Sequence, residues 1–231
     1  MSDTLLVPRR PRVTYGFVGG ILDPPDDGQG FGELGVAWVN RNLGPGRAWA
    51  YEYFSLALMR RLFGAQRKRA AGFASLFRKR GRDGDNVIAA HSNGAEVVVR
   101  ALAGKDLPII RWLHLFSPAC DPDMDANGLN LALETRRVGN LTVWIAKEDR
   151  AMKAAWWSRF FGGWLGLGYG LMGRDGPTHI LPEVADRVSV VPRPGGHSRW
   201  HSTPAALALT MRAVSAFDEN PWAEKKLTPV I

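Results

Sequence analysis

A serine lies between small residues where a short apolar run gives way to a helical pattern. The sequence there reads Ala90-His91-Ser92-Asn93-Gly94. In a nucleophile elbow, a serine occupies a strained turn between a strand and a helix, and small residues two positions before and after it let the helix pass close to the strand. Ala90 and Gly94 stand at those two positions. The pattern therefore predicts a nucleophilic Ser92 at the positive end of a helix dipole.

A serine at the start of a helix also has an ordinary structural role. Serine is a common N-cap, because its hydroxyl accepts a hydrogen bond from an amide of the first helical turn. The alternative interpretation of Ser92 is therefore a simple helix cap after a buried strand. The small residues on both sides favour the nucleophile over the cap.

The elements that would position this serine follow from the hydrophobic periodicity of the chain. Short runs of β-branched, aromatic and apolar residues predict strands at 12–21, 47–54, 86–91, 109–117, 141–146 and 187–192. Helical patterns are found at 31–42, 55–80, 94–104 and 203–217. Strands separated by helices form βαβ units. We therefore expect an α/β fold, with a mainly parallel central sheet of about six strands and helices on both faces.

The Ala90–Gly94 elbow, placed between a strand and a helix, resembles the α/β-hydrolase superfamily. At the level of element order the resemblance covers roughly residues 12–217, whereas the specific motif is short. The elbow departs from the pattern Gly-x-Ser-x-Gly by having Ala90 at its first position. Alanine is small enough for the required turn, so the physical argument is affected less than the motif match.

The resemblance implies an acid and a base that follow the serine in the chain. Members of this superfamily carry their triad in the order Ser, Asp or Glu, His. A carboxylate follows the strand 141–146, where Asp149 is our first choice and Glu148 our second. A histidine follows the strand 187–192 in a glycine-rich turn, where His197 is our first choice and His201 our second.

Two further carboxylates stay open as the triad acid, because they follow another strand. Asp123 and Asp125 lie after the strand 109–117, in a run that also invites comparison with a calcium loop. The EF-hand pattern needs Gly at its sixth position and Glu at its twelfth, where this chain has Ala126 and Ala132. We therefore expect a solvated loop there and no metal site.

The resemblance also implies two backbone amides that would bind an oxyanion. One is the amide of Asn93, directly after the serine. The other would come from the loop after the first core strand, which reads Gly19-Gly20-Ile21 where the superfamily often has His-Gly. We assign Gly20 or Ile21, with Ile21 favoured.

A long glycine-rich and tryptophan-rich insert occupies about 151–186, between the predicted acid and base. Connections of this length are functional or lack fixed structure. Its aromatic residues could form an apolar lid and acyl-binding wall, with Trp156, Trp157 and Trp164 as the predicted substrate contacts. The alternative is that the tryptophans complete the core. Without any linker that divides the chain, we expect residues 1–231 to form a single domain with this insert.

A basic cluster carries much of the charge of the chain. The 231 residues include 30 Lys and Arg against 22 Asp and Glu, for a net charge of +8, and nine of the 30 lie within 60–82. The simplest interpretation is the solvated face of a long helix. The functional alternative is a docking surface for an anionic partner. No nucleic-acid-binding module is recognisable, so no specific nucleic-acid partner is expected.

The remaining composition indicates a globular protein of a reducing compartment. With 45% hydrophobic residues, the chain has enough apolar material for a core. The single Cys120 excludes an intramolecular disulfide. The N-terminus lacks the apolar segment of a secretory signal, and the most apolar stretch, 160–172, is too short to cross a bilayer. We therefore expect a cytoplasmic protein.

Together these features predict a serine hydrolase that cleaves an ester or thioester through an acyl-enzyme. It would need no cofactor and would act on a small-molecule substrate with a hydrophobic acyl group; transfer of the acyl group to an acceptor other than water stays open. The rival prediction is a catalytically silent protein of the same fold, which would use the basic helix at 60–82 to bind an anionic partner.

Overall fold

The computed structural model describes residues 13–20, 30–53, 65–81, 85–104, 106–150 and 170–219. Within these residues, six strands form one sheet in the order β2-β1-β3-β4-β5-β6, and every neighbouring pair is parallel. The strands are β1 (Thr14–Val18), β2 (Ala48–Tyr51), β3 (Asn86–His91), β4 (Ile110–Phe116), β5 (Val138–Ala146) and β6 (Val188–Arg193). The predicted α/β class with a six-stranded parallel sheet is confirmed.

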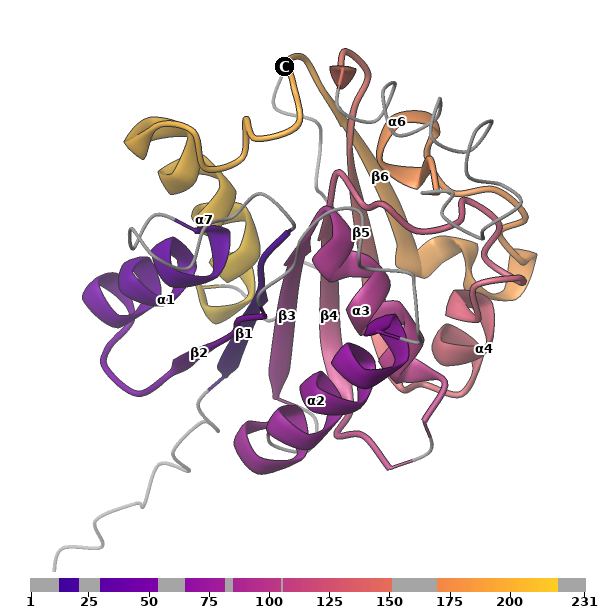
Figure 1. Ribbon diagram of the computed structural model, residues 1–231, viewed down its shortest axis with the longest axis horizontal. Coiled ribbons are helices and arrows are strands. Elements are labelled where there is room, and N and C mark those ends of the chain that lie inside the picture. Colours follow the sequence, from indigo (N-terminus) through magenta and orange to yellow (C-terminus); the bar gives the residue numbers. More distant parts are fainter. Residues whose placement is uncertain are drawn as a thin grey trace, which may run out of the picture.

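Helices cover both faces of this sheet (Figure 1). One face carries the first and last described helices, α1 (Phe31–Asn42) and α7 (Pro204–Glu219). The other face carries α2 (Ala65–Arg80), α3 (Asn93–Leu102) and the short α4 (Leu129–Glu134). Two further short elements, α6 (Met172–Asp175) and the 3-10 helix η3 (Pro182–Arg187), precede β6.

The observed boundaries agree with the periodicity for the long elements and differ for the short ones. Helix α1 has the predicted bounds, and the predicted helix 55–80 is described from residue 65 onward. The β5 strand begins three residues before the predicted position, at Val138. The elements α4, α6 and η3 were not predicted, because four to six residues are too few to display a 3.6-residue period.

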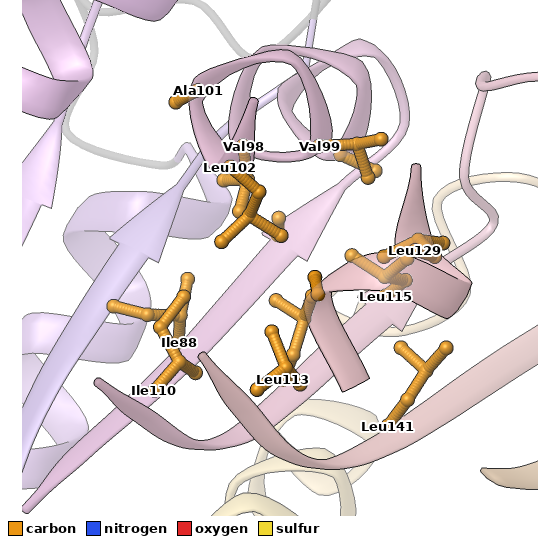
Figure 2. Close-up of a cluster of buried hydrophobic side chains, with 14 of the residues drawn as sticks. Ile88, Val98, Val99, Ala101, Leu102, Ile110, Leu113, Leu115, Leu129 and Leu141 are labelled. Atoms are coloured by element: carbon orange, nitrogen blue, oxygen red, sulfur yellow. The ribbon is translucent and has the colours of Figure 1, made fainter. Parts of the chain in front are cut away.

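One core lies between the sheet and the α2–α3–α4 layer. Figure 2 shows Val98 and Leu102 of α3 directed at the sheet, where Ile88 of β3 and Leu113 and Leu115 of β4 face them. These five side chains are at most 4% exposed. Each apolar side chain removed from water contributes roughly 1.5–3 kcal/mol to folding. This packing fixes α3, whose first residue directly follows Ser92.

A second, more aromatic core lies between the sheet and the α1–α7 layer. Alternate residues of β4 face this side, with His114 stacked between the rings of Trp112 and Phe116. Trp144 of β5 packs on Phe116 and donates from its indole nitrogen to Nδ1 of His114 (3.4 Å). Burial lowers the pKa of His114 to about 3, so its ring is neutral near pH 7 and behaves as an aromatic core residue.

None of the helices in the described ranges is both long enough and apolar enough to cross a membrane.

Two leucines on α4 offer a matched test of this packing. Leu133 is fully buried, whereas Leu131 on the opposite side of the same helix is 54% exposed. Leu133→Ala should lower the free energy of unfolding by about 2–5 kcal/mol, because it leaves a cavity. Leu131→Ala should change it by no more than about 0.5 kcal/mol, as is usual for surface positions. Chemical denaturation of both variants measures the difference, and equal losses would contradict the placement of α4.

Candidate active site

The parallel strands bring their carboxyl ends to a single edge of the sheet. The last pairs are Val18 with Ala90, His91 with Phe116, Phe116 with Trp144, and Ala146 with Arg193. The loops that leave β1, β3, β5 and β6 therefore start side by side, although they are far apart in the chain. In open α/β sheets this is the edge at which ligands bind.

Ser92 occupies a strained turn between β3 and α3. Its backbone has φ 54° and ψ −123°, a region that residues other than glycine rarely adopt and that costs about 1–3 kcal/mol. Hydrogen bonds hold the turn on both sides, since Ser92 N donates to Phe116 O (2.9 Å) and Ser92 O accepts from Ala119 N (3.0 Å). The strain aims the side chain away from the strand, as an elbow requires.

Gly94 allows the close approach that this turn needs. A Cβ atom at Gly94 would lie only 2.4 Å from the carbonyl oxygen of Gly19 and 2.7 Å from that of Val18. Both neighbours are backbone atoms that no rotamer change can move away. The first turn of α3 therefore passes directly over the end of β1, and any side chain at this position would separate them.

The hydroxyl of Ser92 points to a histidine rather than to its own helix. All the amides of the first turn of α3 lie in the described part of the chain, and Ser92 Oγ caps none of them. It lies 2.7 Å from Nε2 of His197, in the loop after β6. The simple capping role is therefore wrong for Ser92.

His197 in turn contacts a buried carboxylate. Its Nδ1 lies 2.5 Å from Oδ2 of Asp149, which is fully buried just past the end of β5. A carboxylate accepts hydrogen bonds only, so His197 Nδ1 carries the proton, and its Nε2 accepts from the hydroxyl of Ser92. The three side chains thus form one continuous hydrogen-bonded chain across three strand ends.

The other candidate acids lie elsewhere. Glu148 is exposed, next to the buried Asp149. Asp123 pairs with Nδ1 of His179 at 3.0 Å, and Asp125 accepts from the side-chain amide of Asn130 at 2.5 Å. The first bond joins the loop after β4 to the residues before η3, and the second joins the same loop to α4. Of the four carboxylates considered, the structure brings Asp149 to His197.

Two further histidines surround His197 without taking its place. His91 donates from Nε2 to the backbone carbonyl of His197 (3.1 Å), so the residue before the serine holds the loop of the base. The ring of His201 packs at 5.0 Å from that of His91 and at 5.7 Å from that of Phe31. His201 was the second choice for the base, but His197 is the histidine in contact with Ser92.

Trp200 anchors the loop that carries His197, a role that the sequence did not predict. It is 4% exposed, and its indole N–H donates to Ser117 Oγ (2.9 Å) in the loop after β4. Its carbonyl accepts from the hydroxyl of Thr210 in α7 (2.9 Å). The only sequence signal for this anchor was a large apolar residue three positions after the candidate base.

The candidate oxyanion amides lie on both sides of Ser92. Asn93 is the first residue of α3, where backbone N–H groups have no partner within the helix. Gly20 lies against the serine, because a Cβ there would come within 2.9 Å of Ser92 Cβ. Ile21, the favoured second donor, lies outside the described residues.

The long insert is described in its second half. Residues 170–186 pack against the loop after β4, where Gly170 N donates to Ala119 O (3.1 Å) and Gly173 N to Pro118 O (2.8 Å). Residues 151–169 lie outside the described part, and with them Trp156, Trp157 and Trp164. The predicted lid and acyl-binding wall therefore stay predictions.

The basic cluster is described from residue 65 onward, as α2. Its buried side includes Phe73 and Phe77, whereas Arg67, Lys68 and the closing Arg78-Lys79-Arg80 are exposed. The helix thus has one face in the core and one basic face toward solvent. The predicted contact with an anionic partner stays a prediction.

Within the described ranges, no group of three or more His, Cys, Asp or Glu side chains is arranged to hold a metal ion. A serine hydroxyl bonded to a histidine, itself oriented by a buried carboxylate, is the arrangement that activates serine as a nucleophile.

Comparisons with known proteins support the fold. No protein-family model matches the chain, and no curated protein sequence does. Among solved structures, a protein of Xanthomonas campestris pv. campestris assigned to the α/β hydrolase superfamily matches with a TM-score of 0.52 at 16% identity, over 90% of this chain and 99% of that one. At this identity the likeness establishes the fold.

Two further solved structures match less closely. The NocB thioesterase domain, solved as a covalent complex with a fluorophosphonate nocardicin G analogue, has a TM-score of 0.49 at 14% identity, over 88% of this chain and 93% of its own. The esterase domain of a Rhodothermus marinus protein has a TM-score of 0.48 at 13% identity, over 91% and 88%.

The close approach at Gly94 has a testable cost. Gly94→Ala places a methyl group against two backbone carbonyls, so it should lower the free energy of unfolding by about 3 kcal/mol despite the better helix propensity of alanine. Gly196→Ala is the matched control, because no atom of the described residues lies within 4 Å of its added Cβ. That variant should stay within about 0.5 kcal/mol of wild type. Equal stability of the two variants in thermal unfolding would refute the close approach.

Proposed function

Because the chain has the α/β-hydrolase fold, we propose that it is a serine hydrolase that cleaves an ester or thioester. The observation that carries the proposal is the continuous chain from the buried Asp149 through His197 to Ser92 Oγ, with bonds of 2.5 and 2.7 Å. The strained backbone of Ser92 supports it, since such strain persists where it serves to present a side chain.

In this mechanism Ser92 Oγ attacks the acyl carbon while His197 Nε2 takes its proton. Asp149 keeps the proton on Nδ1 of the imidazole and stabilises the imidazolium that forms. His197 then delivers the proton to the leaving alcohol or thiol, whose bond to the acyl carbon breaks. A water molecule, deprotonated by the same histidine, releases the acid from the acyl-enzyme.

The negative oxygen of the tetrahedral intermediates would be stabilised by backbone amides. We assign the amide of Asn93 and a second one from Gly20 or Ile21. The position of Asn93 at the start of a helix supports the first assignment, because helix N-termini favour negative charge. Removal of one such donor typically costs about 100- to 1,000-fold in kcat.

The substrate class rests on the insert. We propose a small-molecule substrate with a hydrophobic acyl group in contact with Trp156, Trp157 and Trp164, because apolar side chains commonly line acyl-binding pockets. Transfer of the acyl group to an acceptor other than water uses the same acyl-enzyme, so an acyltransferase is the open alternative to a hydrolase.

Covalent labelling with a fluorophosphonate probe tests the central claim. Wild type should be labelled, Ser92→Ala should not be labelled at all, and His197→Ala should react far more slowly because the serine loses its base. His201→Ala is the matched control for the histidines and should react at close to the wild-type rate. A folded wild-type protein that resists the probe would contradict the proposal and favour the catalytically silent alternative, in which the basic face of α2 binds an anionic partner.

The carboxylate offers a second test with a control at the neighbouring position. Asp149→Asn should lower kcat by about 10,000-fold with little change in fold, because an amide cannot hold the histidine in the required tautomer. Glu148→Gln removes an exposed carboxylate next to it and should leave ester hydrolysis within about twofold of wild type, as expected for a solvated surface charge. Equal losses in the two variants would show that Asp149 is not the acid of the triad.

A further inference from the structure

A largely buried polar network joins the residue after β2, the end of β1 and the start of α3. Its centre is Tyr53, just after β2, whose hydroxyl donates to the carbonyl oxygen of Gly19 (3.2 Å) and accepts from the side-chain amide of Asn93 (3.0 Å). A phenol has one proton to donate, so the two bonds have complementary directions. One hydroxyl therefore joins the end of β1 to the start of α3.

These two segments are the ones to which the oxyanion amides were assigned. The carbonyl of Gly19 and the amide N–H of Gly20 belong to one planar peptide group, so a bond that fixes the first also fixes the direction of the second. The other candidate donor is the backbone amide of Asn93, and Tyr53 binds the side chain of this same residue. We propose that Tyr53 is a positioning residue, which holds the amides of Gly20 and Asn93, as the two halves of the oxyanion hole, at a fixed separation. This inference rests on the proposed function.

The network continues into α2, which supports Asn93 from its other side. Gln66 is 5% exposed, and its side-chain amide donates to Asn93 Oδ1 (2.7 Å) and to Glu96 Oε2 (3.2 Å). Glu96 is also bound by Arg100 in the next turn of α3 (2.8 Å). Asn93 thus has a bonded partner for both ends of its side-chain amide, which leaves it a single orientation.

Arg69 of α2 fixes the ring of Tyr53 itself. Its guanidinium lies 5.2 Å from the centre of that ring, and its Nη1 donates to Gln66 Oε1 (3.4 Å). A cation over an aromatic face is an attractive arrangement. This contact supports the ring position from which the hydroxyl of Tyr53 makes its two bonds.

The burial of this network carries a desolvation cost. Asn93 is fully buried, and Gln66 and Glu96 are each 5% exposed. Polar side chains are expensive to remove from water, and apolar side chains of similar volume often replace buried ionic groups without loss of stability. The bonds of the network converge on the backbone of Gly19 and on Asn93, which is where a serine hydrolase needs two amides at fixed positions.

Tyr53→Phe tests the proposal, with Tyr51→Phe as the matched control. Tyr51 is also partly buried, and its hydroxyl donates to the backbone carbonyl of Arg69 (3.0 Å), a bond made to α2 rather than to Gly19 or Asn93. Each variant loses one hydroxyl. Only the first loses the link between the two oxyanion segments.

Tyr53→Phe should lower kcat for an activated ester, and the rate of labelling by a fluorophosphonate, by about 10- to 100-fold, less than the loss of a whole oxyanion donor. KM should stay within about twofold, because the ground-state ester makes little use of the oxyanion hole. A boronic acid, which forms a tetrahedral adduct on the serine, should bind more weakly by the same factor as kcat/KM falls. Tyr51→Phe should change none of these by more than about twofold.

A second variant keeps the test independent of Tyr53. Asn93→Ala retains the backbone amide and removes the side chain that Tyr53 holds, so it should reproduce the loss in kcat, and the double variant should lose little more than either single one. If wild type is labelled but Tyr53→Phe and Tyr51→Phe react equally fast, Tyr53 is only structural. A wild type that the probe does not label would refute the serine hydrolase itself, so the two failures are distinguishable.

Discussion

The contact between the first turn of α3 and the end of β1 determines how Ser92 and the candidate oxyanion residues lie relative to one another. No side chain separates the two backbones, because Gly94 faces the carbonyl oxygens of Val18 and Gly19. The same approach presses Gly20 against Ser92 and forces the serine to a positive φ. A wider separation would relax the turn, but it would also move the candidate oxyanion segment away from the serine. The backbone strain of Ser92 and the position of the candidate oxyanion segment therefore both depend on the separation between α3 and β1.

The residues around Ser92 are held by different contacts on the two sides of the sheet. On the α1–α7 side, His91 bonds to the carbonyl of His197, and Trp200 fastens the same loop to Ser117. On the α2–α3 side, Tyr53 and Gln66 bond to the side chain of Asn93. The residues before and after Ser92 thus face opposite layers, because β3 ends at His91 and the strained turn at Ser92 leads directly into α3 at Asn93. Neither layer alone determines where the serine lies.

The sequence predicted the parts of this arrangement that depend on local pattern. The bounds of α1, the six strands and the elbow at Ser92 all follow from periodicity and from small residues at fixed spacing. Asp149 and His197 could be selected because each follows a strand, and parallel strands end at one edge. Of the two histidines in that loop, the geometry brings His197 to Ser92.

The supporting residues could not be predicted in the same way. Tyr53, Gln66 and Trp200 are separated from their partners by between 10 and 83 positions in the chain, and nothing in their local sequence marks them. Gln66 stood within a run of basic residues that suggested a solvated face, yet it is buried. Its role follows from which side of α2 meets α3, a property of the tertiary packing.

The strained turn at Ser92 contacts both cores. The binding of a ligand at this site is therefore thermodynamically linked to the stability of the fold. Any ligand that binds the folded site but not the unfolded chain raises the free energy of unfolding, by an amount set by its affinity. Here that gain would spread into both helical layers, since His91 and Asn93 connect the turn to opposite sides of the sheet. In reverse, a cavity in either core loosens the support of the turn. The position of Ser92 therefore depends on the packing of both cores.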